Sequence, residues 1–182
     1  MMKKVCVLLA EGFEEVEALT AVDLLRRAQI YVDTVSIEEG YGVSGAHGIL
    51  VQTEDLFQEV DFSLFDMIVL PGGMPGTRNL EMHKGVKQVI NEYNNNNKLI
   101  AAICAAPTIL GKMGLLKGRK ATCYPGMEEE LHGAVVSSDS VCVDGNIITS
   151  RGVGTAIDFA LRLIAILVNE EKAGEIADAI VY

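Results

Sequence analysis

The sequence predicts an α/β fold, a doubly wound sandwich in which helices cover both faces of a mostly parallel sheet. Short, continuous apolar runs alternate along the chain with longer amphipathic segments. This alternation is typical of strands that are buried on both faces and joined by helical crossovers. Because such crossovers are right-handed, they place helices on both sides of the sheet. A length of 182 residues suits one core, so we expect a single domain over residues 1–182.

The expected strands are short and rich in β-branched residues. They cover residues 5–10, 31–37, 49–53, 67–70, 99–103 and 135–136. A hairpin over residues 141–150 follows, with its turn at Asp144-Gly145. The expected helices show apolar positions at helical spacing. They cover residues 14–28, 84–93, 105–113, 155–168 and 172–179.

Composition excludes several classes of protein. Hydrophobic residues make up 49% and charged residues 22%, which fits neither a disordered nor a fibrous chain. The formal net charge of −10 repels nucleic-acid phosphates, and we find no nucleic-acid motif. The apolar runs are too short to cross a bilayer, and the first residues do not form a signal peptide, so we expect a cytoplasmic protein without a membrane span. Its four cysteines lack paired spacing and should be free thiols.

Cys104 is the main candidate for a reactive group. It follows the apolar run 99–103, so it should lie at the carboxyl end of a buried strand, where α/β proteins collect ligands. Ala102 and Ala106 flank it two residues away on either side, the small–x–nucleophile–x–small pattern of a sharp nucleophile elbow. Pro107 suits the first turn of a helix, whose N-terminus would favour a thiolate. The alternative is a cysteine that merely fills the core.

Glu17 is the second candidate. On a helical wheel it falls inside the apolar arc of the first helix, where a carboxylate must be paired or protonated. Since this helix follows the first strand, Glu17 and Cys104 can meet at one edge of the sheet. Glu14 lies on the same arc, but in the first turn, where a carboxylate can serve exposed amides. The apolar arc comprises Ala18, Ala21, Leu24, Leu25 and Ala28.

The glycine-rich turn at residues 71–76 supplies the third element. Its glycines permit positive φ and close backbone approach. The amides of Gly73 and Ala105 could together hold an oxyanion or an oxidised sulfur. A second glycine pair, Gly152 and Gly154, could cradle an anion, but no dinucleotide fingerprint follows the first strand. No Cys/His/Asp cluster has ligand spacing, so we expect neither a metal nor a cofactor.

Taken together, these segments resemble the ThiJ/PfpI superfamily, in the branch of YajL and the parkinsonism-associated protein deglycase. The matching stretches are residues 8–17, 69–73, 100–107 and 149–156. The resemblance implies a flavodoxin-like sandwich, a homodimer, and Cys104 as an oxidation-sensitive nucleophile. It also implies that Glu17 hydrogen-bonds the cysteine and that Gly73 and Ala105 supply backbone donors.

The chain departs from the family pattern at three positions. Peptidase-like members carry a histidine directly after the cysteine, where this chain has Ala105, so proteolysis is disfavoured. Tyr124 stands where the parkinsonism-associated protein has a histidine. His47 replaces an arginine that, in the family, reaches the site from the partner subunit. We keep His47 and Tyr124 as possible substrate contacts.

Two functions follow from the resemblance. The first is a cofactor-independent glyoxalase or a protein or nucleotide deglycase, acting on a small α-oxoaldehyde such as methylglyoxal or on a glycated substrate. The alternative is a non-enzymatic redox sensor or redox-regulated chaperone working through oxidation of Cys104. A cysteine peptidase or amidase is a distant alternative. In each case we expect Cys104 to be the most acidic of the four thiols.

Overall fold

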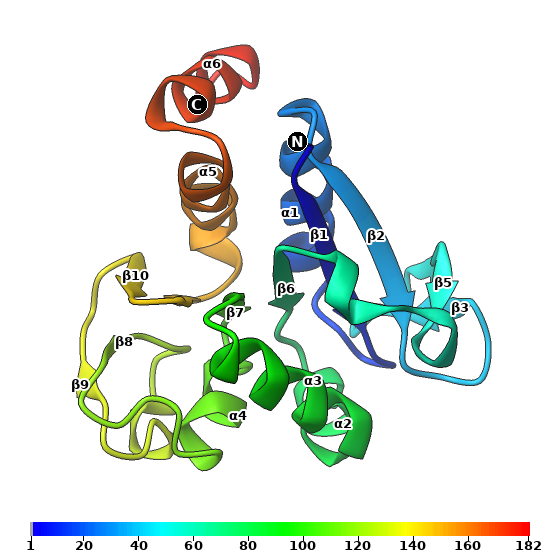
Figure 1. Ribbon diagram of the computed structural model, residues 1–182, viewed down its shortest axis with the longest axis vertical. Coiled ribbons are helices and arrows are strands. Elements are labelled where there is room, and N and C mark those ends of the chain that lie inside the picture. Colours follow the sequence, from blue (N-terminus) through cyan, green and yellow to red (C-terminus); the bar gives the residue numbers. More distant parts are fainter. Residues whose placement is uncertain (1) are drawn as a thin grey trace.

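A mostly parallel sheet organises the computed structural model, which describes residues 2–182 (Figure 1). Within that range its seven strands follow the order β10-β11-β7-β6-β1-β2-β5. All neighbouring strands are parallel except β10 and β11, which form an antiparallel hairpin at one edge. The expected α/β class is confirmed. The strands are β1 (Lys4–Leu9), β2 (Tyr31–Ser36), β5 (Asp55–Leu56), β6 (Met67–Leu70), β7 (Leu99–Ile103), β10 (Val141–Asp144) and β11 (Ile147–Ser150).

Helices cover both faces of this sheet. One layer holds α1 (Glu15–Arg27), α5 (Ala156–Leu167) and α6 (Glu170–Ala179), and α1 and α5 lie side by side in Figure 1. The other layer holds α3 (Lys84–Asn95) and α4 (Pro107–Lys112), with α2 (Gly76–Met82) packed beside α3. None of the helices described between residues 2 and 182 has both the length and the apolar character that crossing a membrane requires.

The alternation of side chains along β1 shows why the sheet needs both layers. Val5, Val7 and Leu9 belong to the core under α1 and α5, whereas Cys6 and Leu8 belong to the core under α3 and α4. All five side chains are fully buried. Successive residues of a strand face opposite sides, so a continuous apolar run is stable only between two apolar layers.

Several short elements lie outside the main sheet. A two-stranded hairpin forms from β3 (Gly42–Ser44) and β4 (Leu50–Gln52), and a parallel pair from β8 (Lys120–Ala121) and β9 (Val135–Val136). The expected strand at residues 49–53 therefore exists as β4 but pairs only with β3. The sequence analysis missed β3, β5, β8 and α2. Single 3-10 turns span Phe57–Glu59, Phe62–Leu64, Glu128–Glu130 and Val153–Thr155.

Several expected boundaries differ by one or two residues, and two of these differences have a clear structural cause. The helix expected from residue 105 begins only at Pro107, because Cys104 adopts a left-handed φ of 65° and residues 104–106 form a turn. The hairpin turn lies at Gly145-Asn146, one residue later than expected, because Asp144 pairs with Ile147 across the two strands.

A substitution at Phe159 tests how much the core between the sheet and the helices α1 and α5 contributes to stability. It is fully buried, so Phe159→Ala should lower the free energy of unfolding by about 3–5 kcal/mol through lost burial and a residual cavity. Urea titration followed by circular dichroism measures the change. Val168→Ala, at an exposed side chain after α5, should change it by less than about 0.5 kcal/mol. Equal effects of the two substitutions would show that Phe159 does not support the core as described.

Candidate active site

The carboxyl ends of four neighbouring strands, β1, β6, β7 and β11, converge on one pocket. Its volume is about 870 Å³, ample for a small organic molecule. The start of α1, the loop after β3, the turn after β6, the elbow after β7 and the loop after β11 line it. The residues of chemical interest among them are Glu17, His47, Gly73, Cys104, Tyr124 and Arg151.

Cys104 sits on a strained elbow directly after β7. Its φ of 65° lies in the left-handed region, which costs a non-glycine residue on the order of 1–3 kcal/mol. Two hydrogen bonds hold the backbone there: its N–H donates to Ser150 O at 3.0 Å, and its carbonyl accepts from Tyr124 N at 2.7 Å. The elbow predicted from the flanking alanines is confirmed in its geometry, and it turns the thiol away from the strand and into the pocket.

Two backbone amides face the sulfur of Cys104. The N–H groups of Gly73 and Ala105 both act to lower the pKa of the thiol. Neither donates to another backbone group within the described residues. The structure therefore places the two expected donors where they can stabilise negative charge on the sulfur or on an oxygen bound to it.

Glu17 lies beside Cys104, deep under the first turn of α1. Its exposed fraction is 1%, and its Oε2 accepts a hydrogen bond of 2.9 Å from Gly72 N. The start of α1 is tied to the same turn, because Glu14 N donates to Gly72 O at 2.9 Å. The other oxygen, Oε1, is buried and has no hydrogen-bond partner of ordinary geometry in residues 2–182. Glu17 thus has one oxygen held by the backbone and one left for the pocket.

Gly72 explains how the carboxyl and the thiol come so close. A Cβ atom at this position would lie 2.5 Å from Cys104 Cβ and 2.7 Å from Glu17 Oε2. Any residue other than glycine would collide with both groups. The sequence analysis named the glycine-rich turn for its amides but not for this close packing.

Burial decides the protonation of the pair. It raises the pKa of Glu17 to about 7, against the opposing effects of hydrogen bonds from Cys104 and Gly72. Burial also raises the pKa of Cys104, and an ionised Glu17 raises it further, to about 12. The two groups therefore hold at most one negative charge between them near neutral pH, and adding a second is unfavourable.

This result corrects the expectation that the thiolate of Cys104 is favoured. With Glu17 ionised, burial and the neighbouring carboxylate together raise the pKa of Cys104 above that of an ordinary thiol, against the opposing effect of the Ala105 and Gly73 amides. A proton on Glu17 lowers the pKa of Cys104 again, because a neutral carboxyl does not repel the thiolate and can donate a hydrogen bond to it.

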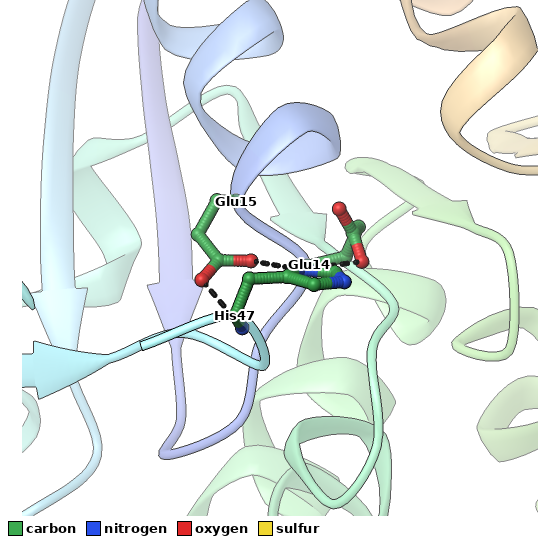
Figure 2. A group of neighbouring side chains, drawn as sticks. All are labelled: Glu14, Glu15 and His47. Carbon is green, nitrogen blue, oxygen red and sulfur yellow. Dashed lines mark hydrogen bonds and ion pairs between the residues drawn. The ribbon is translucent and has the colours of Figure 1, made fainter. Parts of the chain in front are cut away.

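A second cluster forms at the rim of the same pocket (Figure 2). Glu15 is 3% exposed, and its Oε1 accepts from His47 N at 2.7 Å while its Oε2 lies 2.8 Å from His47 Nδ1. Glu14 Oε2 lies 3.6 Å from the same nitrogen, and no hydrogen bond joins the Glu14 side chain to the helix amides. The expected capping role of Glu14 was therefore wrong. Glu15 was not predicted as a site residue, because its position beside the apolar arc of the first helix does not distinguish it from a surface carboxylate.

The three side chains of this rim cluster each offer a potential ligand atom, all within 4.8 Å of one another. Sequence spacing did not reveal the group, because His47 lies on a loop far along the chain. His47 Nδ1 is already bonded to Glu15 Oε2, so these side chains form an ion-pair cluster. His47 was expected at the partner subunit's site, but here it lines the pocket of its own chain.

Two further residues line the pocket opposite α1. Tyr124 is 51% exposed, and its ring lies 3.4 Å from the position that a Cβ of Gly152 would occupy. Arg151 lines the pocket while its Nη1 donates to Ser138 O at 3.3 Å. Tyr124 was expected near the site and is there, whereas Arg151 was not singled out, since an arginine after a strand carries no distinctive signal.

These features place the chain among α/β proteins that carry a cysteine on a sharp turn between a strand and a helix, at the floor of a pocket. It belongs to the DJ-1/PfpI family, whose model matches residues 3–166. The resemblance drawn from the sequence motifs is thereby confirmed.

Relatives of known name agree with this assignment. The chain is 38% identical to the protein dj-1beta of Drosophila melanogaster, covering 97% of this chain and 96% of that protein. It is 31% identical to a protein named as a deglycase from Pyrococcus abyssi, covering 90% and 99%. Protein DJ-1 homolog B of Arabidopsis thaliana is 40% identical over 98% of this chain, which spans only 41% of that longer relative.

Solved structures show the same fold. The oxidised DJ-1 of Toxoplasma gondii matches with a TM-score of 0.95 at 38% identity, covering 99% of this chain and 98% of that one. The Drosophila melanogaster DJ-1beta structure matches with a TM-score of 0.94 at 38% identity, covering 100% and 98%.

Glu17→Gln tests the buried carboxyl. The pKa of Glu17 is about 7 in the folded state against an ordinary 4.5, so between these pH values the folded state binds more protons than the unfolded one. Wild-type stability should therefore fall as pH rises through this window, by roughly 3 kcal/mol in total. Glutamine cannot ionise, so the variant should lack this loss. Urea unfolding at pH 4.5 and pH 8 measures both proteins.

The control for this experiment is Glu171→Gln, at an exposed carboxylate in the first turn of α6. In this variant the free energy of unfolding should depend on pH as it does in the wild type. An identical dependence in wild type and Glu17→Gln would show that Glu17 does not titrate as its burial requires.

Proposed function

We propose that the protein is a cofactor-independent enzyme that converts small α-oxoaldehydes, such as methylglyoxal, to hydroxy acids, and that also releases their early adducts. The observation that carries this proposal is the Cys104–Glu17 pair, a thiol and a carboxyl that share one charge at the floor of a pocket. A nucleophile beside a proton acceptor is the arrangement that covalent catalysis on a carbonyl requires. A relative named as a deglycase supports the same chemistry.

The first step joins the thiol to the aldehyde. Cys104 Sγ adds to the aldehyde carbon, its proton passes through Glu17 to the carbonyl oxygen, and a hemithioacetal forms. The amides of Gly73 and Ala105 stabilise the developing negative oxygen. A Glu17 pKa of about 7 suits a group that must both accept and return a proton near neutral pH.

The second step moves a hydrogen within the substrate. Glu17 removes the proton from the former aldehyde carbon and returns it to the neighbouring ketone carbon. The first carbon is oxidised and the second reduced, so no external oxidant or reductant is needed. The product is a thioester of lactate on Cys104, which water hydrolyses to lactate and free thiol.

Glycated amines enter the same sequence. The sulfur displaces the amine from its adduct with the aldehyde carbon, forming the C–S bond as the C–N bond breaks, and the amine leaves with a proton from Glu17. The resulting hemithioacetal is the one formed from free methylglyoxal. One site therefore accounts for both the glyoxalase and the deglycase forms of the proposal.

Methylglyoxal consumption tests the proposal. Wild type should convert it to lactate, with D- and L-lactate measured separately, whereas Cys104→Ser should lose at least about 100-fold of the rate, since a hydroxyl is a far weaker nucleophile at this pH. Cys142→Ser, at a buried thiol in β10, is the matched control and should keep the wild-type rate. Lactate formation that survives in Cys104→Ser would refute the proposed nucleophile.

The exposure of the thiols favours a second candidate, a redox sensor or redox-regulated chaperone. Cys104 is partly exposed, whereas Cys6, Cys123 and Cys142 are buried. Peroxide would oxidise Cys104 to a sulfenic acid, releasing water, and a second equivalent would give a sulfinic acid. The amides of Gly73 and Ala105 would hold the added oxygens.

Graded peroxide treatment separates Cys104 from the other thiols. Mass spectrometry of peptides should show sulfinic acid at Cys104 before any other cysteine, because access rather than acidity distinguishes it. Cys104→Ser should lack this early modification. Earlier oxidation of Cys6, Cys123 or Cys142 would contradict the redox function.

A homodimer remains part of the proposal. Apolar side chains stay exposed on α1 and on the β3–β4 hairpin, which adjoin through a bridge between Phe13 and Gly45. Exposed apolar side chains that gather on one face are typical of protein interfaces. They are Val16, Leu19, Ile49 and Leu50, exposed by 47%, 37%, 54% and 67%.

A peptidase or amidase has less support. The residue after the proposed nucleophile is Ala105, so no imidazole stands directly after Cys104 to act as its paired base.

A further inference from the structure

A histidine at the rim of the pocket is fixed by a buried carboxylate. Glu15 binds both the backbone N–H and the ring of His47, at 2.7 Å and 2.8 Å (Figure 2). Glu15 also lies 3.4 Å from Ile49 N, so its carboxylate holds the whole loop. Gly45 leaves the room that this carboxylate needs, because a Cβ there would lie within 2.4 Å of three Glu15 atoms.

The bond to Glu15 settles which ring nitrogen of His47 is free. A carboxylate accepts the proton of Nδ1, which leaves Nε2 without a partner among residues 2–182. The side chain is 68% exposed and lines the same pocket as Cys104 and Glu17. A carboxylate that fixes the orientation of an imidazole is the arrangement found where histidine transfers protons.

The charges around His47 favour its protonated form. Its hydrogen bond to Glu15 and the negative charges of Glu14 and Glu15 raise the pKa of His47. Both carboxylates belong to α1, and they are the charged groups of the described chain that act on the ring. The pocket's other titratable side chains are Glu17, Cys104, Tyr124 and Arg151.

We propose that His47 is a second proton-transfer group of this site, serving the oxygens of the substrate while Glu17 serves its carbons, and that Glu15 is the positioning residue for His47. This inference rests on the proposed function. His47 stands where the family pattern has an arginine. A guanidinium keeps its proton near neutral pH, whereas an imidazole can release and take up a proton.

The internal hydrogen transfer needs a group of this kind. When Glu17 takes the proton from the first carbon, negative charge develops on the oxygen of the second. His47 gives that oxygen its proton and becomes neutral, which leaves an enediol. Glu17 then protonates the second carbon, and His47 takes the proton from the first oxygen as the thioester carbonyl forms. Both residues end in their starting states, so atoms and charges balance.

Glu17 alone is poorly placed for all of these transfers. Its Oε2 accepts a hydrogen bond from Gly72 N–H, which leaves only the buried Oε1 free to exchange a proton. During the enediol stage Glu17 already carries the proton removed from carbon, so it cannot also accept the proton of an oxygen. Arg151 is not an alternative, because guanidinium stays protonated.

The test measures kcat and KM for methylglyoxal across pH in wild type, His47→Gln, Glu15→Gln and Glu14→Gln, with the exposed His132→Gln as control. In wild type, kcat should fall at alkaline pH as the imidazolium loses its proton. His47→Gln should lower kcat about 100-fold with little change in KM, and this alkaline fall should disappear. His132→Gln should match wild type.

The carboxylate variants separate positioning from mere folding. Since Glu15 and Glu14 raise the pKa of His47, Glu15→Gln should move the alkaline fall of kcat to lower pH, and Glu14→Gln should move it less in the same direction. Thermal melts confirm that each variant is folded. A loss of structure would lower the amount of active enzyme but would not shift the pH at which kcat falls.

The outcomes distinguish this inference from the function on which it rests. If wild type makes lactate while His47→Gln keeps its kcat and its alkaline fall, His47 transfers no proton and only the inference is overturned. An unshifted alkaline fall in Glu15→Gln overturns the positioning role. If wild type makes no lactate at any pH, the proposed function fails and the inference fails with it.

Discussion

Two buried acidic groups at the floor of the pocket can carry only one negative charge between them, and this limit determines their protonation. Glu17 and Cys104 both lose solvation at the floor of the site, and no cation among residues 2–182 contributes to the pKa of either group. A carboxylate and a thiolate together would double the cost of burial and add their mutual repulsion. The pair therefore behaves as one acid with two possible sites for its charge, and the proposed catalysis depends on transfer of a proton between them.

The order of the strands in the sheet is what brings this pair together. Cys104, Glu17 and Gly72 come from three segments that meet only because β1, β6 and β7 are adjacent and parallel. Their carboxyl ends bring the three residues so close together that no methyl group would fit at Gly72 between the other two. The two apolar layers that bury these strands supply the rigidity that such a close approach requires.

Sequence reasoning succeeded where a single residue type had few structural options. The apolar strands, the sharp turn at Cys104 and the buried Glu17 each followed from local pattern and simple energetics. It failed where the outcome depended on contacts distant in the chain. Glu14 and Glu15 are the same residue type at adjacent positions in the sequence. In the folded chain, however, it is the Glu15 carboxylate that accepts hydrogen bonds from the amides of His47 and Ile49. The acidity of Cys104 also escaped, because it depends on whether a neighbouring group already carries the charge.

The way Glu15 holds the loop has a consequence for how this site can diversify. One oxygen of its carboxylate binds backbone N–H groups of residues 47 and 49, which every amino acid except proline possesses. The ring of His47 contributes only the contact to the other oxygen. The loop can therefore keep its shape when the side chain at position 47 is exchanged, and the exchange alters only what projects into the pocket. An exchange at position 47 can therefore change the chemistry that this loop brings to the pocket, the proposed proton transfer included, without rebuilding the scaffold.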